Sequence, residues 1–349
     1  MSERDTKRNA SGGRIVSTTH TIFIAAPPKV VYELIAEVAR WPYIFTPTVH
    51  VERLYGTGSN ERLRLWAVAN GAVRSWTSQR TLNPGELRIR FKQEQPAAPI
   101  AAMAGEWVFV PLPGNATSVV LLHEFRAIDD DVANTALITQ AVDRNSTSEL
   151  AALKHIAELG SLPAKLVYSF ADSMTIASEP GPVYDFLYRA QEWPRRLPHV
   201  NRLTVDEAVP NVQTIEMQTC DLDGAEQTAR LVRVCFPYEC IVYKQTELSE
   251  LMSAHVGRWR VYPVADGVRV TSHNTVLIRP DRVRRLLGRD AGVEQAHQLI
   301  RRAVSQHNWI TLRHAKQAVE GRPSAQVDHL TTARPPAGGL TPASVLQVD

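Results

Sequence analysis

The chain has 349 residues, 44% of them hydrophobic and 21% charged, a composition typical of globular proteins that excludes wholesale disorder. A single hydrophobic core of this length is unusual, so we expect two domains. The formal net charge is only +3, with 39 Lys and Arg residues dispersed among 36 Asp and Glu residues, which argues against nucleic acid as a partner.

The cysteines and the amino terminus indicate the compartment. Cys220, Cys235 and Cys240 form no CxxC pair and have no His at zinc-finger spacing, so we interpret them as reduced packing residues. The amino terminus is polar and charged, without the apolar core of a secretory signal, and no later apolar run has the length of a membrane span. These features predict a cytoplasmic protein with no membrane partner.

The first elements follow from local patterns. Residues 1–14 are polar, and we expect a disordered tail there. Residues 16–25 alternate polar and apolar, which predicts a strand. The Pro-Pro pair at 27–28 suits a helix start, and that helix should run to about residue 40, where the Trp-Pro pair at 41–42 ends it.

A series of strand-like runs follows, separated by turns that contain glycine. Asn70-Gly71 is a strong hairpin signal. We expect strands at about 49–55, 61–69, 72–81, 86–94, 105–110 and 117–126. The segment 133–159 then has helical periodicity. A curved antiparallel sheet with one long helix across it leaves a space that can hold a ligand.

The chain repeats itself with a period of 152 residues. YELIAEVARWP resembles YDFLYRAQEWP, and their tryptophans are Trp41 and Trp193. Lys92-Gln93 recurs at the same interval as Lys244-Gln245, and Trp107 recurs as Trp259. Because a repeated supersecondary unit counts domains independently of propensity, each half should have the same fold.

The repeat also sets the boundaries. The second half closes with a helical segment, 292–319, whose Leu-Arg-His matches the Leu-Lys-His of the first final helix. We therefore expect domains at 15–160 and 167–320, a linker at 161–166, and a disordered tail at 321–349, which is rich in Pro, Ala, Gly and Thr.

Several segments carry a resemblance to a known family. WPYIFTPTVHVERL, NGAVRSWTSQRTL, MAGEW, EWPRRLPHVNRL and IVYKQTELSELMSAHVGRW resemble the START-like helix-grip proteins, and among them the di-domain polyketide aromatase/cyclases of bacterial type II polyketide synthases. The resemblance covers about residues 15–320. It implies an α+β fold of two tandem helix-grip domains, each a curved antiparallel sheet wrapped around a long C-terminal helix.

The resemblance also implies which side chains line the cavities. In the first half they are Trp41, Phe45, Trp76, Ser78, Arg80, Met103, Trp107 and Asn145. The position that carries a tyrosine in single-domain relatives is Thr48 here, so no phenolic acid is expected there. In the second half the corresponding residues are Trp193, Arg233, His255 and Trp259, and His199 is an additional ionisable group.

Chemistry assigns roles to these residues. A poly-β-ketone closes spontaneously in wrong ways, so aromatic walls must hold its shape. A developing enolate needs a fixed donor, a role that suits Arg80 with Ser78 in the first cavity and Arg233 in the second. Dehydration needs an acid and a base, for which we propose His199 and His255.

Plainer interpretations exist for the same residues. Trp41 and Trp193 could be ordinary core residues, and an Arg within a strand is more often solvated on the outer face. Residues 76, 78 and 80 alternate onto one face, which favours the cavity. His199 follows a proline in a loop and could lie on the surface.

Two arginine clusters could bind an acidic partner. Arg279, Arg282, Arg284, Arg285 and Arg289 form the densest basic segment, and Arg195, Arg196 and Arg202 flank the second cavity. The plainer interpretation is a solvated face, and the alternative is docking of an acidic acyl carrier protein.

The sequence thus favours an enzyme without metal or organic cofactor. It would cyclise or dehydrate a carrier-bound poly-β-ketone made by a minimal polyketide synthase, with or without a ketoreductase, and the resemblance implies first-ring closure between the seventh and twelfth carbons. The alternatives are a non-catalytic START-like binding protein for a lipid or an aromatic product, and a scaffold with one degenerate domain.

Overall fold

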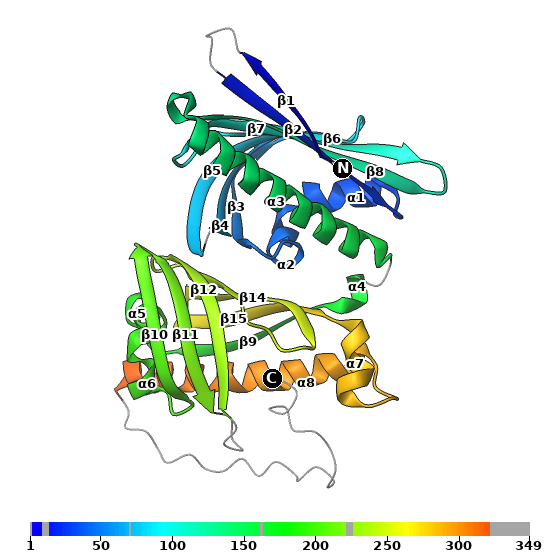
Figure 1. Ribbon diagram of the computed structural model, residues 1–349. Coiled ribbons are helices and arrows are strands. Elements are labelled where there is room, and N and C mark those ends of the chain that lie inside the picture. Colours follow the sequence, from blue (N-terminus) through cyan, green and yellow to red (C-terminus); the bar gives the residue numbers. More distant parts are fainter. Residues whose placement is uncertain (1, 9–13, 70, 161–162, 221–225, 322–349) are drawn as a thin grey trace. The chain divides into compact units, whose positions relative to one another are not determined.

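The computed structural model describes residues 2–8, 14–69, 71–160, 163–220 and 226–321 (Figure 1). The chain divides into two compact units, residues 1–163 and 164–349. The division falls inside the segment expected as a linker, whose described part forms a short helix, α4 (Pro163–Leu166). Of the expected C-terminal tail, residues 322–349 lie outside the described residues.

The first unit consists of an antiparallel sheet, a broken helix and a long final helix. Its strands are β1 (Ser2–Arg8), β2 (Arg14–Ile24), β3 (Thr48–Thr57), β4 (Asn60–Ala69), β5 (Ala72–Asn83), β6 (Arg88–Gln93), β7 (Ile100–Leu112) and β8 (Ala116–Ala127). Its helices are α1 (Pro28–Ala36), η1 (Val38–Arg40), α2 (Trp41–Ile44), η2 (Ile128–Asp130) and α3 (Val132–Glu158). The strand order is β1-β2-β8-β7-β6-β5-β4-β3.

The second unit repeats this arrangement. Its strands are β9 (Val167–Ile176), β10 (Val200–Val209), β11 (Val212–Cys220), β12 (Glu226–Phe236), β13 (Cys240–Gln245), β14 (Met252–Val264) and β15 (Gly267–Ile278). Its remaining helices are α5 (Pro180–Tyr188), η3 (Ala190–Glu192), α6 (Trp193–Arg196), α7 (Pro280–Leu287) and α8 (Val293–Glu320). The order β10-β11-β12-β13-β14-β15-β9 matches that of the first unit without β1.

The final helix of each unit packs on the sheet of that unit. In α3 the buried positions include Val142, Ser146, Leu150 and Leu153, spaced three or four residues apart. That spacing produces one apolar stripe, and the stripe packs on β2 and β8. The α8 helix packs on β9 and β15 in the same way. The predicted fold class, two helix-grip units in tandem, is confirmed.

Two local predictions are wrong. The segment expected as a disordered tail contains β1, which pairs with β2 from Ser2 opposite His20 to Arg8 opposite Arg14; residues 9–13 of that tail are outside the described part. Composition predicted disorder because the segment lacks apolar residues. An edge strand, however, offers free backbone donors and acceptors that pair with any sequence.

The helix expected up to residue 40 is also interrupted. It ends at Ala36, and α2 starts at Trp41 with Pro42 in its first turn, where a missing amide hydrogen is tolerated. The second unit has the same break between α5 and α6. The Trp-Pro pair therefore begins a helical turn, and this turn carries Trp41 and Trp193.

No helix within the described ranges combines the length and the apolarity that a bilayer crossing requires.

Candidate functional site

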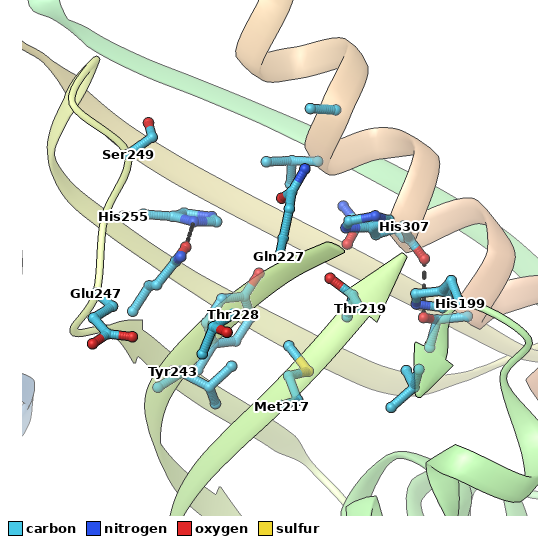
Figure 2. Close-up of a pocket in the computed structure, with 18 of the residues that line it drawn as sticks. His199, Met217, Thr219, Gln227, Thr228, Tyr243, Glu247, Ser249, His255 and His307 are labelled. Atoms are coloured by element: carbon cyan, nitrogen blue, oxygen red, sulfur yellow. Dashed lines mark hydrogen bonds between the residues drawn. The ribbon is translucent and has the colours of Figure 1, made fainter. Parts of the chain in front are cut away.

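A cavity of about 810 Å³ lies in the second unit between the sheet and α8. Its lining comes from β10 to β14 and from one side of α8, so it is the space expected beneath the final helix. Figure 2 shows His255 and Tyr243 on one side of this cavity and His199 and His307 on the other. The volume is in the range of sites for small organic ligands.

Trp193 and Arg233 form one end of the cavity. The Trp193 indole donates from Nε1 to the carbonyl oxygen of Phe186 at 3.1 Å, which fixes the ring at the end of α5. The Arg233 guanidinium lies over this ring, with Cζ 5.5 Å from its centroid. Arg233 is only 3% exposed, and Nη2 donates to the carbonyl oxygen of Leu187 at 2.7 Å.

The remaining donors of Arg233 are unusual for a buried cation. Its Nε and Nη1 find no hydrogen-bond partner among the described residues. The nearby thiol of Cys235, whose pKa is raised by burial, is a weak acceptor. Burial lowers the pKa of Arg233, but a guanidinium stays charged at any working pH. A buried positive charge with incompletely satisfied donors attracts an anionic oxygen on a ligand in the cavity that Arg233 lines.

Arg80, its counterpart in the first unit, has its donors engaged. Nη1 and Nη2 donate to the carbonyl oxygens of Ile35 and Ala36, both at 2.8 Å, at the end of α1. Nε and Nη2 both donate to Oε2 of Glu61, the former at 3.1 Å. The Arg80 guanidinium also lies 5.3 Å from the Trp41 ring centroid.

One substitution between the repeats accounts for this difference. Glu61 stands opposite Arg80 in the β4–β5 pairing, and Gln213 stands opposite Arg233 in the β11–β12 pairing. The position whose carboxylate neutralises Arg80 in the first unit therefore carries an amide in the second unit. Gln213 donates to Glu207 at 2.8 Å, and no carboxylate of the described residues pairs directly with Arg233, on which Glu207 acts only through its charge.

His199 and His307 stack at another part of the cavity. Their ring centroids are 5.1 Å apart with an interplanar angle of 12°, and both residues line the cavity. Burial, followed by the charges of His307 and His314, lowers the pKa of His199 to about 3. The Nδ1 atom of His199 is buried without a partner in the described part of the chain. At neutral pH His199 is thus an uncharged base.

His255 is held by two amides. Its Nδ1 lies 2.8 Å from Oε1 of Gln245, and its Nε2 lies 3.0 Å from Oδ1 of Asn274. Burial lowers the pKa of His255, and the hydrogen bond to Asn274 opposes that shift only in part. Tyr243 donates from its hydroxyl to the same Asn274 oxygen at 2.6 Å.

The structure brings one group of the first-unit residues together. The rings of Trp41 and Phe45 meet edge to face at 5.8 Å, and Trp41 and Trp76 pack on one apolar cluster. Ser78 is buried and donates from Oγ to the carbonyl oxygen of Lys92 at 3.1 Å. Trp76, Ser78 and Arg80 share a sheet face, as their alternation predicted.

The other first-unit residues lie elsewhere. Met103 belongs to a separate cluster with Ile138 and Val142 of α3, and Trp107 is buried and stacks on Phe109 at 6.5 Å. Asn145 is exposed on α3, so its assignment as a cavity residue is wrong. The buried stripe of α3 includes Val142 and Ser146, and Asn145 points away from it by one helical step of about 100°.

In the second unit Trp193, Arg233, His199, His255 and Trp259 all line the same cavity. Sequence reasoning missed Tyr243, Asn274 and His307. The signal for Tyr243 was available, because IRFKQ and IVYKQ align within the repeat and differ by a hydroxyl at Phe91 and Tyr243. It also missed Glu149, a half-buried carboxyl on α3 whose pKa is raised by burial to about 7.

The fold and the cavity define the chain as a tandem helix-grip protein with ionisable groups inside one apolar-walled cavity. Residues 24–146 match the family model described as polyketide cyclase / dehydrase and lipid transport. Comparison with curated proteins and solved structures extends this match over both units.

The granaticin polyketide synthase bifunctional cyclase/dehydratase of Streptomyces violaceoruber is 39% identical over 302 residues, 86% of this chain and 93% of that protein. The actinorhodin polyketide synthase bifunctional cyclase/dehydratase of Streptomyces coelicolor is 40% identical over 309 residues, 86% of this chain and 95% of that one. The crystal structure of the di-domain ARO/CYC BexL from the BE-7585A biosynthetic pathway matches with a TM-score of 0.81 and 44% identity, covering 88% of this chain and 99% of that chain.

The chain belongs to this family of di-domain polyketide cyclase/dehydratases, and it is an enzyme of that class.

Proposed function

We propose that the protein acts on a poly-β-ketone tethered to an acyl carrier protein, closes its first ring between the seventh and twelfth carbons, and dehydrates that ring to an aromatic one. The observation that supports this most directly is the second-unit cavity, where the cation Arg233 and the neutral imidazole of His199 line one aromatic-walled space.

The chemistry fits these groups. In aldol closure one carbon between carbonyls loses a proton and attacks a ketone carbon, whose oxygen takes up a proton. In dehydration a base removes the next proton, and the new hydroxyl leaves with a proton as water. His199 is the proposed base for dehydration, because its imidazole lines the cavity and is uncharged at neutral pH. The burial that keeps it uncharged also makes it a weaker base than an exposed histidine. Arg233 suits the oxygen that becomes negative.

The two units would divide this work. Arg80 is bound to Glu61 and to the end of α1, so we propose that it positions Trp41 and the α1 terminus and does not meet an enolate directly. The first unit would then shape the chain for ring closure with Trp41 and Trp76, and the second would carry the proton transfers of dehydration.

The α7 helix is the proposed carrier-protein contact. Arg282 and Arg285 pair with Glu250, which follows the cavity residue Ser249, so α7 adjoins the cavity lining. Arg284 and Arg289 make no ion pair within the described ranges, which leaves their charge available for an acidic carrier.

Reconstitution with a minimal synthase, with and without a ketoreductase, tests the function. Adding the protein should replace shunt products by one aromatic ring pattern. Unchanged products together with tight binding of an aromatic polyketide would instead identify a binding protein.

A further inference from the structure

One cross-strand row of residues runs along the same line of both sheets. In the second unit, successive pairings place Arg233 opposite Tyr243, Tyr243 opposite Gly257, and Gly257 opposite Asn274. Directly opposed residues project to one face of a sheet with Cβ atoms about 5 Å apart. Arg233 and Tyr243 both line the cavity, so this face is the cavity face.

The first unit has the same row with different chemistry. Arg80 stands opposite Phe91, Phe91 opposite Gly105, and Gly105 opposite His123. The ring at the second position is kept, but its hydroxyl is present only in Tyr243.

The glycine explains how the ring is placed. A Cβ on Gly257 would lie 2.3 Å from Cζ and 2.4 Å from Oη of Tyr243, closer than real contacts allow. The missing side chain thus lets the Tyr243 ring lie across β14 and reach Asn274 on β15, where the hydroxyl donates at 2.6 Å. Gly105 makes the same room for Phe91, whose Cζ would be 2.4 Å from a Cβ there.

The hydroxyl can leave Asn274 without leaving a buried acceptor unpaired. Nε2 of His255 lies 3.0 Å from the same Asn274 oxygen. In the tautomer that carries its proton on Nε2, His255 donates to that oxygen, which therefore keeps a partner when Tyr243 turns its proton toward the cavity. Asn274 and His255 are therefore positioning residues for the hydroxyl.

We propose that Tyr243 is a catalytic residue of the second cavity, which, beside Arg233, donates a hydrogen bond to the substrate oxygen that gains negative charge during dehydration. This inference rests on the proposed function for its substrate. The oxygen receives one donor from a neutral phenol and one from a fixed cation, and both residues stand side by side on adjacent strands. The phenol stays protonated, because burial raises the pKa of Tyr243.

The first test is Tyr243→Phe in the reconstituted synthase. The variant should fold, because phenylalanine occupies the matching position of the first unit. Formation of the aromatic product should fall about a hundredfold while a ring-closed, non-aromatic compound accumulates. Tyr262→Phe, which removes a hydroxyl from an exposed tyrosine on β14, is the matched control and should leave the products unchanged.

The second test uses no polyketide. An absorbance titration of 1-naphthol bound to the protein measures how strongly the cavity prefers naphtholate to naphthol. Wild type and Tyr262→Phe should lower the naphthol pKa, and Tyr243→Phe should lose about one unit of that shift, a tenfold weaker preference.

The two tests separate the two proposals. A naphthol shift that depends on Tyr243, combined with no effect of wild type on synthase products, would reject the proposed function but keep the oxyanion site. Aromatisation and naphthol shifts that are the same in wild type and Tyr243→Phe would overturn the role of Tyr243.

Discussion

The matched arginines allow one substitution to have opposite consequences in the two units. Arg80→Met and Arg233→Met each replace a buried guanidinium by an unbranched apolar chain of similar length. Arg80 is paired with a carboxylate and two carbonyl oxygens, whereas Arg233 has one carbonyl acceptor and two donor atoms that find no partner within the described ranges. We expect the first change to damage stability and the second to damage catalysis.

The magnitudes follow from the contacts. Arg80→Met leaves Glu61, whose side chain is 10% exposed, with the partly exposed Arg53 as its one remaining ionic partner in the described part of the chain. Removing one member of a buried pair costs about 3–5 kcal/mol. Arg233→Met loses one hydrogen bond, worth about 1 kcal/mol, but also removes two unsatisfied donors that each cost about 1–3 kcal/mol. Its free energy of unfolding should therefore stay equal to that of wild type or rise.

Calorimetry and hydrogen exchange can measure both effects. Arg80→Met should lower the midpoint of one unfolding transition by roughly 10 °C and increase exchange in β4 and β5. Arg233→Met should keep wild-type exchange in β11 and β12 while aromatic product falls about a hundredfold. Equal losses of stability in the two variants, or full aromatisation by Arg233→Met, would refute this reasoning.

Three further outcomes are expected. His199→Ala should accumulate a closed, non-aromatic ring in the reconstituted synthase. The aromatase rate of the wild-type protein should persist as pH falls from 7 to about 5, because the pKa of His199 in the folded protein lies near 3. A fall in rate centred at the ordinary histidine value of 6.5 would contradict the assignment. Because the pKa of His199 is depressed in the folded state, its contribution to the free energy of unfolding is complete above pH 6.5 and is lost as pH falls towards 3. His199→Gln should therefore reduce the pH dependence of stability in acid denaturation monitored by circular dichroism. Charge reversal at Arg284 and Arg289 should raise the KM for carrier-bound substrate and not for a small soluble mimic, and equal changes in both would exclude carrier docking.

Much of the fold was predictable from local patterns and the repeat. Alternation identified the strands, helical spacing identified α3 and α8, and the 152-residue interval between Trp41 and Trp193 showed that two copies exist. Two local errors had a common cause. For β1 and for the break before α2, the outcome depended on backbone groups, which composition does not describe.

The site was predicted less completely. The sequence by itself determined which residue types recur, including the arginine at positions 80 and 233, and it predicted that Arg80 shares a strand face with Trp76 and Ser78. It could not determine whether those charges are neutralised. That depends on the residue opposite in the next strand, Glu61 or Gln213, and pairing register exists only in the assembled sheet.

The same limit applies to the cavity groups. Tyr243, Gly257 and Asn274 are distant in sequence, and only the antiparallel pairing of β13, β14 and β15 places them in one row. The stacked rings of His199 and His307 likewise come from β10 and α8, more than a hundred positions apart. Sequence determined the chemistry available to this protein, and tertiary structure decided which groups are buried together, because burial and charge pairing are properties of the packed chain.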